Sequence, residues 1–148
     1  KMQPQNLDDK LILSFTENDK DKDGLINMDE MAKCFEEHGL SKVFLDCLET
    51  NSFTLKKYNK NMNKLLDINE KLKKTFKQHD IDGVGYITCD KLKEVLLEKL
   101  CKPTLFDRII EHFKLSSTAE ISFNEFVEII VKAWEFDVEK TDEIETNF

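Results

Sequence analysis

An internal duplication is the feature of this sequence that most constrains the fold. Phe15 and Phe76 are 61 residues apart, and five further positions repeat at the same offset. The repeated pairs are Phe15 and Phe76, Asp19 and Asp80, Asp21 and Asp82, Gly24 and Gly85, Ile26 and Ile87, and Met31 and Leu92. In both repeats, apolar residues four positions apart lead into a stretch rich in Asp and Gly, after which helical spacing resumes. Each repeat is therefore predicted to be a helix, a loop and a second helix.

Helical spacing also occupies the rest of the chain. Ser41 can cap a short helix, and further helices are expected over residues 54–66, 104–113 and 124–134. Pro and Gly are scarce outside the turns, and no strand pattern is longer than a few residues. The sequence predicts an all-α fold of eight short helices.

The duplication also predicts how the chain divides. One repeat falls in an N-terminal lobe, residues 1–66, and the other in a C-terminal lobe, residues 67–136. Residues 137–148 are acidic with little apolar content, so we expect a mobile tail. The first residue is Lys1 rather than a methionine, which favours a piece cut from a longer chain.

Charge and composition exclude several classes of function. The net charge is −8, the wrong sign for neutralising nucleic acid phosphates but suited to cations or a basic protein segment. No apolar run could span a bilayer and no secretory signal pattern is present, so we expect a cytoplasmic protein. The cysteines are far apart and are expected to be reduced, buried thiols: Cys34, Cys47, Cys89 and Cys101.

The segment from Asp19 to Glu30 carries the pattern of a calcium-binding loop. Calcium prefers about six to eight oxygen ligands, which a twelve-residue loop supplies from positions 1, 3, 5, 7, 9 and 12. Gly24 stands at position 6, where the chain must turn with positive φ. The candidate ligands are the side chains of Asp19, Asp21, Asp23, Asn27 and Glu30, with the main-chain carbonyl of Leu25.

These residues make the chain resemble the calmodulin superfamily of paired EF-hand proteins, from about Leu7 to Trp134. The resemblance implies four helix-loop-helix units in two lobes, with short β-bridges between paired loops. The residue at position 8 of each loop would form the bridge, which pairs Ile26 with Phe53 and Ile87 with Ile121. One calcium ion is expected, in the first loop, where magnesium can compete.

The third loop, Asp80 to Lys91, departs from the calcium pattern. Val84 offers no oxygen at position 5, and Lys91 places an ammonium where the pattern requires a carboxylate. The fourth loop begins with Lys114 and retains one carboxylate ligand, Glu125, and the second is shortened around Phe53. We expect these three loops to bind no calcium and to hold their lobes together through apolar contacts.

The resemblance implies a mechanism that depends on Glu30. In sensor EF-hands, calcium draws the last loop glutamate into its coordination sphere, and the exit helix swings to open an apolar groove. Here Phe15, Met31 and Phe35 would line that groove. An amphipathic basic helix would be its partner, either in the same chain or in another protein.

Two identities fit this mechanism. The stretch from Lys71 to Leu97 resembles the third hand of a calcium-dependent protein kinase, which implies a calmodulin-like regulatory region acting on an attached kinase. The stretch from Phe15 to Phe35 is similar to the first hand of myosin regulatory light chains, which implies a chain bound to a motor's neck helix with a largely structural ion. The sequence slightly favours the first identity, the regulatory region of a calcium-dependent protein kinase.

The remaining conspicuous residues indicate no second site. His38, His79 and His112 share no ligand spacing and are expected to be solvated or capping residues. The phenylalanines and Trp134 fall at helical spacings typical of a core. No phosphate loop and no nucleophile with a base is present, so the chain alone is not expected to be an enzyme. The lysine-rich runs are expected to be solvated helix faces: Lys56, Lys57, Lys60, Lys64, Lys71, Lys73, Lys74 and Lys77.

Overall fold

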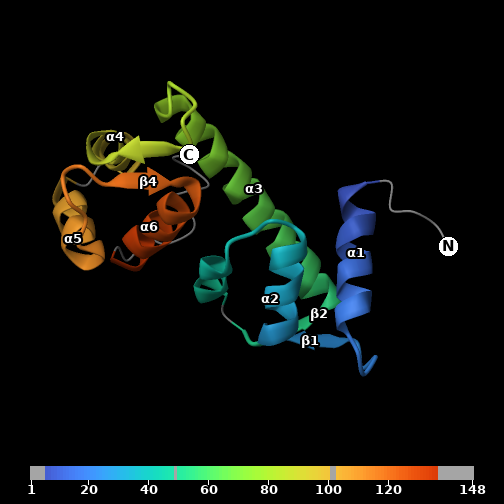
Figure 1. Ribbon diagram of the computed structural model, residues 1–148. Helices are drawn as coiled ribbons and strands as arrows, with labels where there is room; N and C mark the ends of the chain where they lie inside the picture. The colour runs from blue at the N-terminus through green and yellow to red at the C-terminus, as the bar shows by residue number, and fades with distance from the viewer. Residues whose placement is uncertain (1–5, 49, 101–102, 137–148) are drawn as a thin grey trace. The chain divides into compact units, whose positions relative to one another are not determined.

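The computed structural model describes residues 6–48, 50–100 and 103–136 (Figure 1). These residues form six α-helices, a 3-10 helix, a π-helical turn and two antiparallel pairs of short strands. The prediction of an all-α fold with bridges between paired loops is confirmed. The chain divides into two compact units, unit 1 (Lys1–Asp67) and unit 2 (Ile68–Phe148).

Some predictions fall outside the described residues, namely those for the tail 137–148 and for Cys101. Cys34 and Cys89 are buried free thiols, and Cys47 is partly buried. Burial raises the pKa of the Cys34 thiol to about 11, which keeps it protonated and unreactive near neutral pH. Among the described helices, none has the length and apolar character that a membrane span requires.

Unit 1 starts with a capped helix and ends in a helix that continues into unit 2. The side chain of Asn6 accepts a hydrogen bond from the Asp9 amide at 2.9 Å, which fixes the start of the first helix. Ser41 caps the helix that follows it, as predicted, but that helix is 3-10 rather than α. The elements are α1 (Leu7–Asn18), β1 (Leu25–Asn27), α2 (Met28–Glu37), the 3-10 helix η1 (Lys42–Cys47), β2 (Ser52–Thr54) and α3 (Leu55–His79).

The strand pairs follow the predicted register. Ile26 lies opposite Phe53 in the antiparallel pair β1–β2, and Ile87 lies opposite Ile121 in the pair β3–β4. All four side chains are at most 2% exposed. The position-8 residues therefore join the two loops of each unit, including the loops that are predicted to bind no calcium.

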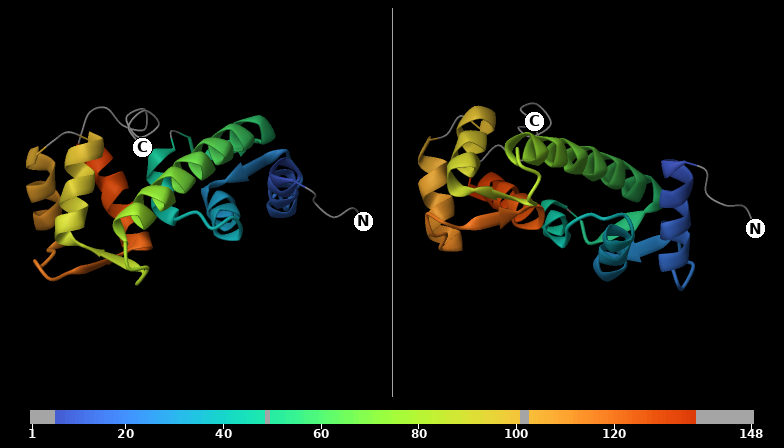
Figure 2. Two further views of the ribbon diagram at one scale, coloured as in Figure 1. Left: turned by 90° about the horizontal axis from the view of Figure 1, so that it is seen from above. Right: turned by 45° about the horizontal axis from the view of Figure 1, so that its top comes forward.

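Helix α3 corrects the prediction of two separate helices around residue 67. It is 25 residues long. Figure 2 shows that it runs without a break. No Gly or Pro interrupts it, and its buried apolar residues keep a spacing of three or four along the whole length. These residues are Tyr58, Met62, Leu65, Ile68, Leu72 and Phe76.

Unit 2 repeats the plan of unit 1. Its aromatic core contains Phe76, whose ring centroid lies 5.6 Å from those of Phe123 and Phe126. The helix after its first loop changes into a π-helical turn after Val95. The prediction of eight regular helices is therefore not met at this position. Besides the second half of α3, the elements are β3 (Tyr86–Thr88), α4 (Cys89–Val95), η2 (Leu96–Leu100), α5 (Pro103–Phe113), β4 (Glu120–Ser122) and α6 (Phe123–Phe136).

Candidate metal centre

The loop between α1 and β1 is built by backbone turns that bring acidic side chains together. The Asp19 amide donates to the Phe15 carbonyl at 2.9 Å and ends α1, and the Lys22 amide donates to the Asp19 carbonyl at 3.2 Å. Gly24 has φ +81°, the conformation that the sequence pattern requires at this turn. Lys22 also has positive φ, at 56°.

Three of the predicted ligands converge in this loop. Asp19, Asp21 and Asp23 each offer a carboxylate oxygen, and these oxygens lie within 4.8 Å of one another. Within residues 6–48, 50–100 and 103–136, no other group of three or more acidic, His or Cys side chains is arranged in this way. Carboxylates at this separation repel one another in the absence of a cation.

Asp19 shows that the loop fits a cation. Its Oδ2 accepts a hydrogen bond from the Gly24 amide at 3.0 Å, while its Oδ1 is buried and has no hydrogen-bond partner. The residue is only 8% exposed. Because a buried, unpaired carboxylate oxygen is costly, it marks a position where a hard cation would be bound by oxygen ligands.

The pKa values of the two exposed aspartates, Asp21 and Asp23, are shifted in opposite directions. A hydrogen bond with the Asp23 side chain raises the pKa of Asp21 above its ordinary value. The pKa of Asp23 is lowered, chiefly because its carboxylate accepts from the Leu25 amide, at 2.9 Å. Asp21 therefore takes up a proton more readily than Asp23 does.

Glu30 is not part of the group of converging carboxylates, and together with Asn27 it caps helix α2. Asn27 Oδ1 accepts from the Glu30 amide at 2.8 Å, and Glu30 Oε1 accepts from the Asn27 amide at 2.9 Å. This reciprocal pair is a capping box. This second role was not predicted from the sequence, although an Asn followed three residues later by a Glu before a helix is its usual signal.

The third loop follows the same backbone path but satisfies its own carboxylate. The two oxygens of Asp80 accept from the Val84 and Gly85 amides at 3.0 and 2.9 Å, so neither lacks a partner. The Lys91 ammonium lies 3.7 Å from Glu94 Oε2 on the same helix. Asp80 thus closes its loop with backbone hydrogen bonds, whereas Asp19 leaves an oxygen unpaired.

The fourth loop, at residues 114–125, also has hydrogen-bond partners for some of its polar groups. The hydroxyls of Ser116 and Thr118 lie 3.3 Å apart, and the Ser116 carbonyl accepts from the Cys89 thiol at 3.1 Å and from the Ala119 amide. In unit 1 the corresponding segment is the 3-10 helix η1 followed by β2. Both segments support the strand pairs rather than a group of acidic ligands.

Comparison with known proteins identifies the fold. Residues 69–131 match the model of the EF-hand domain pair family. Unit 1 has the same succession of helix, loop, strand and helix, with the same antiparallel pairing of its loops. Unit 2 therefore contains an EF-hand domain pair.

The chain is similar to two troponin C chains of Homarus americanus and spans less than two thirds of the length of each. It is 34% identical to isoform 1 over 118 residues, which cover 78% of this chain and 64% of that protein. It is 40% identical to isoform 2A over 62 residues, which cover 40% of this chain and 41% of that protein. Among solved structures, a homologue of programmed cell death 6 protein from Leishmania major Friedlin is 18% identical, with a TM-score of 0.49, over 95% of this chain and 83% of that chain.

Proposed function

We propose that this chain is an EF-hand protein of the calmodulin superfamily, a cytoplasmic, non-enzymatic calcium-binding regulator that takes one Ca²⁺ in the loop from Asp19 to Glu30. The buried, unpaired Oδ1 of Asp19, held among the other two aspartates, is the observation that carries this proposal. Asp19, Asp21 and Asp23 would supply carboxylates, Leu25 a carbonyl, and Asn27 and Glu30 the remaining oxygens. Magnesium would compete for the same ligands.

The proposed response begins at Glu30. Bound calcium carries a double positive charge, which attracts the Glu30 carboxylate more strongly than the Asn27 amide does. Glu30 would then release the Asn27 amide and turn toward the aspartates, and α2 would move with it. Phe15, Met31 and Phe35 are at most 5% exposed in this structure, and movement of α2 away from α1 would uncover them.

Isothermal titration calorimetry of the full chain with CaCl₂ tests the proposed site. We expect one site in the wild type, loss of the binding heat in Glu30→Gln, and unchanged binding in Lys91→Ala. Glu30→Gln removes the bidentate carboxylate, whereas Lys91 belongs to a loop whose aspartate is already satisfied. Absence of binding heat in the wild type, or two or more tight sites, would contradict the proposal.

An amphipathic basic helix is the proposed partner of the uncovered groove. The net charge of −8 supports a basic partner, and the groove residues support an apolar helix face. A fluorescent peptide with Leu and Lys at helical spacing should bind in CaCl₂ and be released by EGTA. Equal binding in both conditions would show that the groove does not depend on calcium.

A serine/threonine protein kinase joined to this chain is the favoured object of control, because Lys71 to Leu97 resembles the third hand of calcium-dependent kinases. The second candidate is a myosin neck helix bound as a light chain binds it, which the concentration of calcium ligands in the first loop favours. The coding sequence upstream of Lys1 distinguishes them. A kinase catalytic domain there supports the first, and a start codon within a few residues supports the second.

A further inference from the structure

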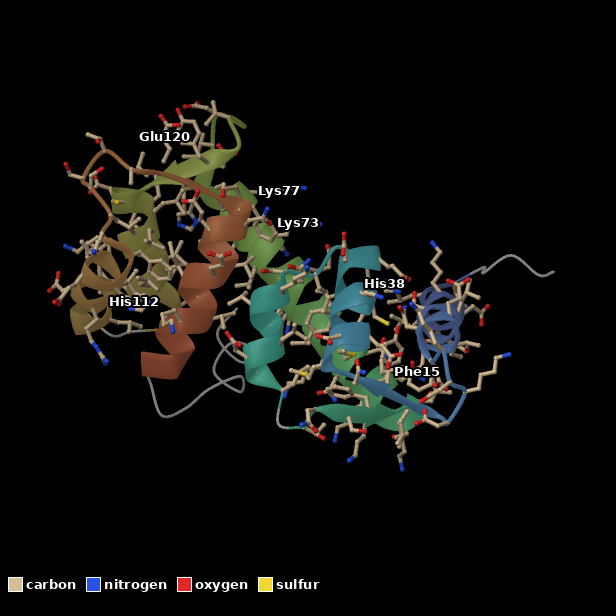
Figure 3. The ribbon with its side chains drawn as sticks, turned by 60° about the horizontal axis from the view of Figure 1, so that its bottom comes forward. Phe15, His38, Lys73, Lys77, His112 and Glu120 are labelled. Atoms are coloured by element: carbon tan, nitrogen blue, oxygen red, sulfur yellow. The ribbon has the colours of Figure 1, made fainter. Side chains whose placement is uncertain are left out.

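We infer that a polar latch between α1 and α2 holds the first hand closed and thereby lowers its calcium affinity. The latch consists of Ser14 and Asn18 on α1 with Cys34, Glu37 and His38 at the end of α2. Figure 3 labels His38 at this end of α2 and Phe15 on α1. This inference rests on the proposed calcium site, whose affinity the latch would regulate.

The Ser14 hydroxyl is the centre of the latch. It donates to Glu37 Oε2 at 2.8 Å, and it lies 2.9 Å from His38 Nε2. Ser14 is only 6% exposed, so water has little access to its hydroxyl. Separating the two helices would break both contacts.

Asn18 extends the latch to the edge of the metal loop. Its Nδ2 lies 3.0 Å from Glu37 Oε1, 3.4 Å from Cys34 Sγ and 2.8 Å from the Ser14 carbonyl. The next residue in the chain is Asp19, which carries the unpaired oxygen. The same side chain therefore holds the end of α2 and borders the first candidate ligand.

Tyr58 of α3 closes the apolar side of this cluster. It is fully buried, and its ring centroid lies 5.2 Å from that of Phe15. Its hydroxyl is buried without a hydrogen-bond partner, and burial raises the pKa of this phenol. Ser14, Asn18 and Cys34 thus adjoin a packed core, whereas Glu37 reaches them from the exposed surface of α2.

The latch and the proposed metal response act on opposite ends of one helix. Glu30 is in the first turn of α2, and Glu37 is its last residue. When Glu30 turns toward the aspartates and α2 swings, Cys34, Glu37 and His38 must leave Ser14 and Asn18. Part of the free energy of calcium binding is therefore used to break these contacts, and removing them should tighten binding.

The variant Ser14→Ala in the full chain tests the latch by calcium titration. We expect its dissociation constant to fall about fivefold, a typical magnitude for coupling between sites. The matched control is Thr16→Ala on the same helix, because its hydroxyl donates to the Ile12 carbonyl within α1. Unchanged or weaker calcium binding in Ser14→Ala would overturn the latch, since a merely structural loss would weaken binding.

A second variant approaches the latch from α2. Glu37→Gln should also tighten calcium binding relative to Glu36→Gln, which removes the same charge from the neighbouring exposed residue. Because Ser14 and Glu37 share a hydrogen bond, the double variant should bind less tightly than the sum of the two effects predicts. Full additivity would overturn the latch, whereas a wild type that binds no calcium would overturn the proposed function instead.

Discussion

At the scale of single residues, Asp19 and Asp80 show how equivalent positions serve different purposes. Both begin a loop and both accept from the glycine amide five residues later. The second oxygen of Asp80 accepts from the Val84 amide, whereas that of Asp19 is buried without a partner. One loop is complete as folded, and the other retains an oxygen for a ligand.

This contrast predicts opposite effects of the same substitution. Asp19→Asn removes a buried charge, so thermal stability in EGTA should stay equal or rise, while the stabilisation by calcium is lost. Asp80→Asn replaces one accepting oxygen with a donor, so stability should fall by about 1 kcal/mol and calcium binding should stay unchanged. Melting curves in EGTA and in CaCl₂ measure both. Destabilisation of both variants in EGTA would contradict the reading of Asp19.

His38 predicts how stability depends on pH. Burial lowers the pKa of its imidazole below the ordinary value of 6.5, with an opposing effect of Glu37 and a further lowering by Lys10. The unfolded chain therefore binds a proton at higher pH than the folded chain does. The stability of unit 1 should fall as pH drops through 6.5 toward the folded pKa.

Urea unfolding of the EGTA-treated protein at several pH values measures this effect. The variant His38→Gln should lose the part of the pH dependence that arises here, and the difference between the two curves isolates His38 from His79 and His112. Superimposable curves would show that His38 is equally protonated in the folded and unfolded chains.

At the scale of elements, the strand pair β1–β2 gives the second loop of unit 1 a structural role that requires no bound ion. Phe53 is fully buried opposite Ile26, so Phe53→Ala should destabilise unit 1 by about 3–5 kcal/mol and weaken calcium binding. The half-buried Phe106 of α5, changed to Ala, is the control and should leave calcium binding unchanged. Urea denaturation and calorimetry measure the two effects. Normal affinity in Phe53→Ala would show that the first loop does not need its partner strand.

The sequence allowed some of these elements to be predicted and concealed others. The pairing of Ile26 with Phe53 was predictable, because the resemblance to paired EF-hand proteins implies that the position-8 residues of two loops lie opposite each other. The continuity of α3 was not, because the number of helices around Asp67 depends on whether buried faces on both sides stay in phase. The contact of Ser14 with His38 joins residues 24 positions apart, and only tertiary packing decides it.

At the scale of the whole molecule, the acidic cluster lies in unit 1 and the single tryptophan lies in unit 2. Each unit has its own buried core and its own strand pair. A ligand stabilises the unit that binds it, by about 2.7 kcal/mol at a hundred times its dissociation constant. Calcium is therefore expected to act on the two units unequally.

Hydrogen exchange measured by mass spectrometry tests this inequality. In CaCl₂, amide protection should rise in α1, α2 and the first half of α3, and change little in α5 and α6. The thermal transition followed by Trp134 fluorescence reports on unit 2. Calcium should shift it less than the gain in amide protection would predict for unit 1. Equal gains in both units would mean that calcium also binds unit 2, or that α3 transmits its stabilisation in full. Glu30→Gln distinguishes these outcomes, because it removes the gain in unit 2 only if that gain originates in the first loop.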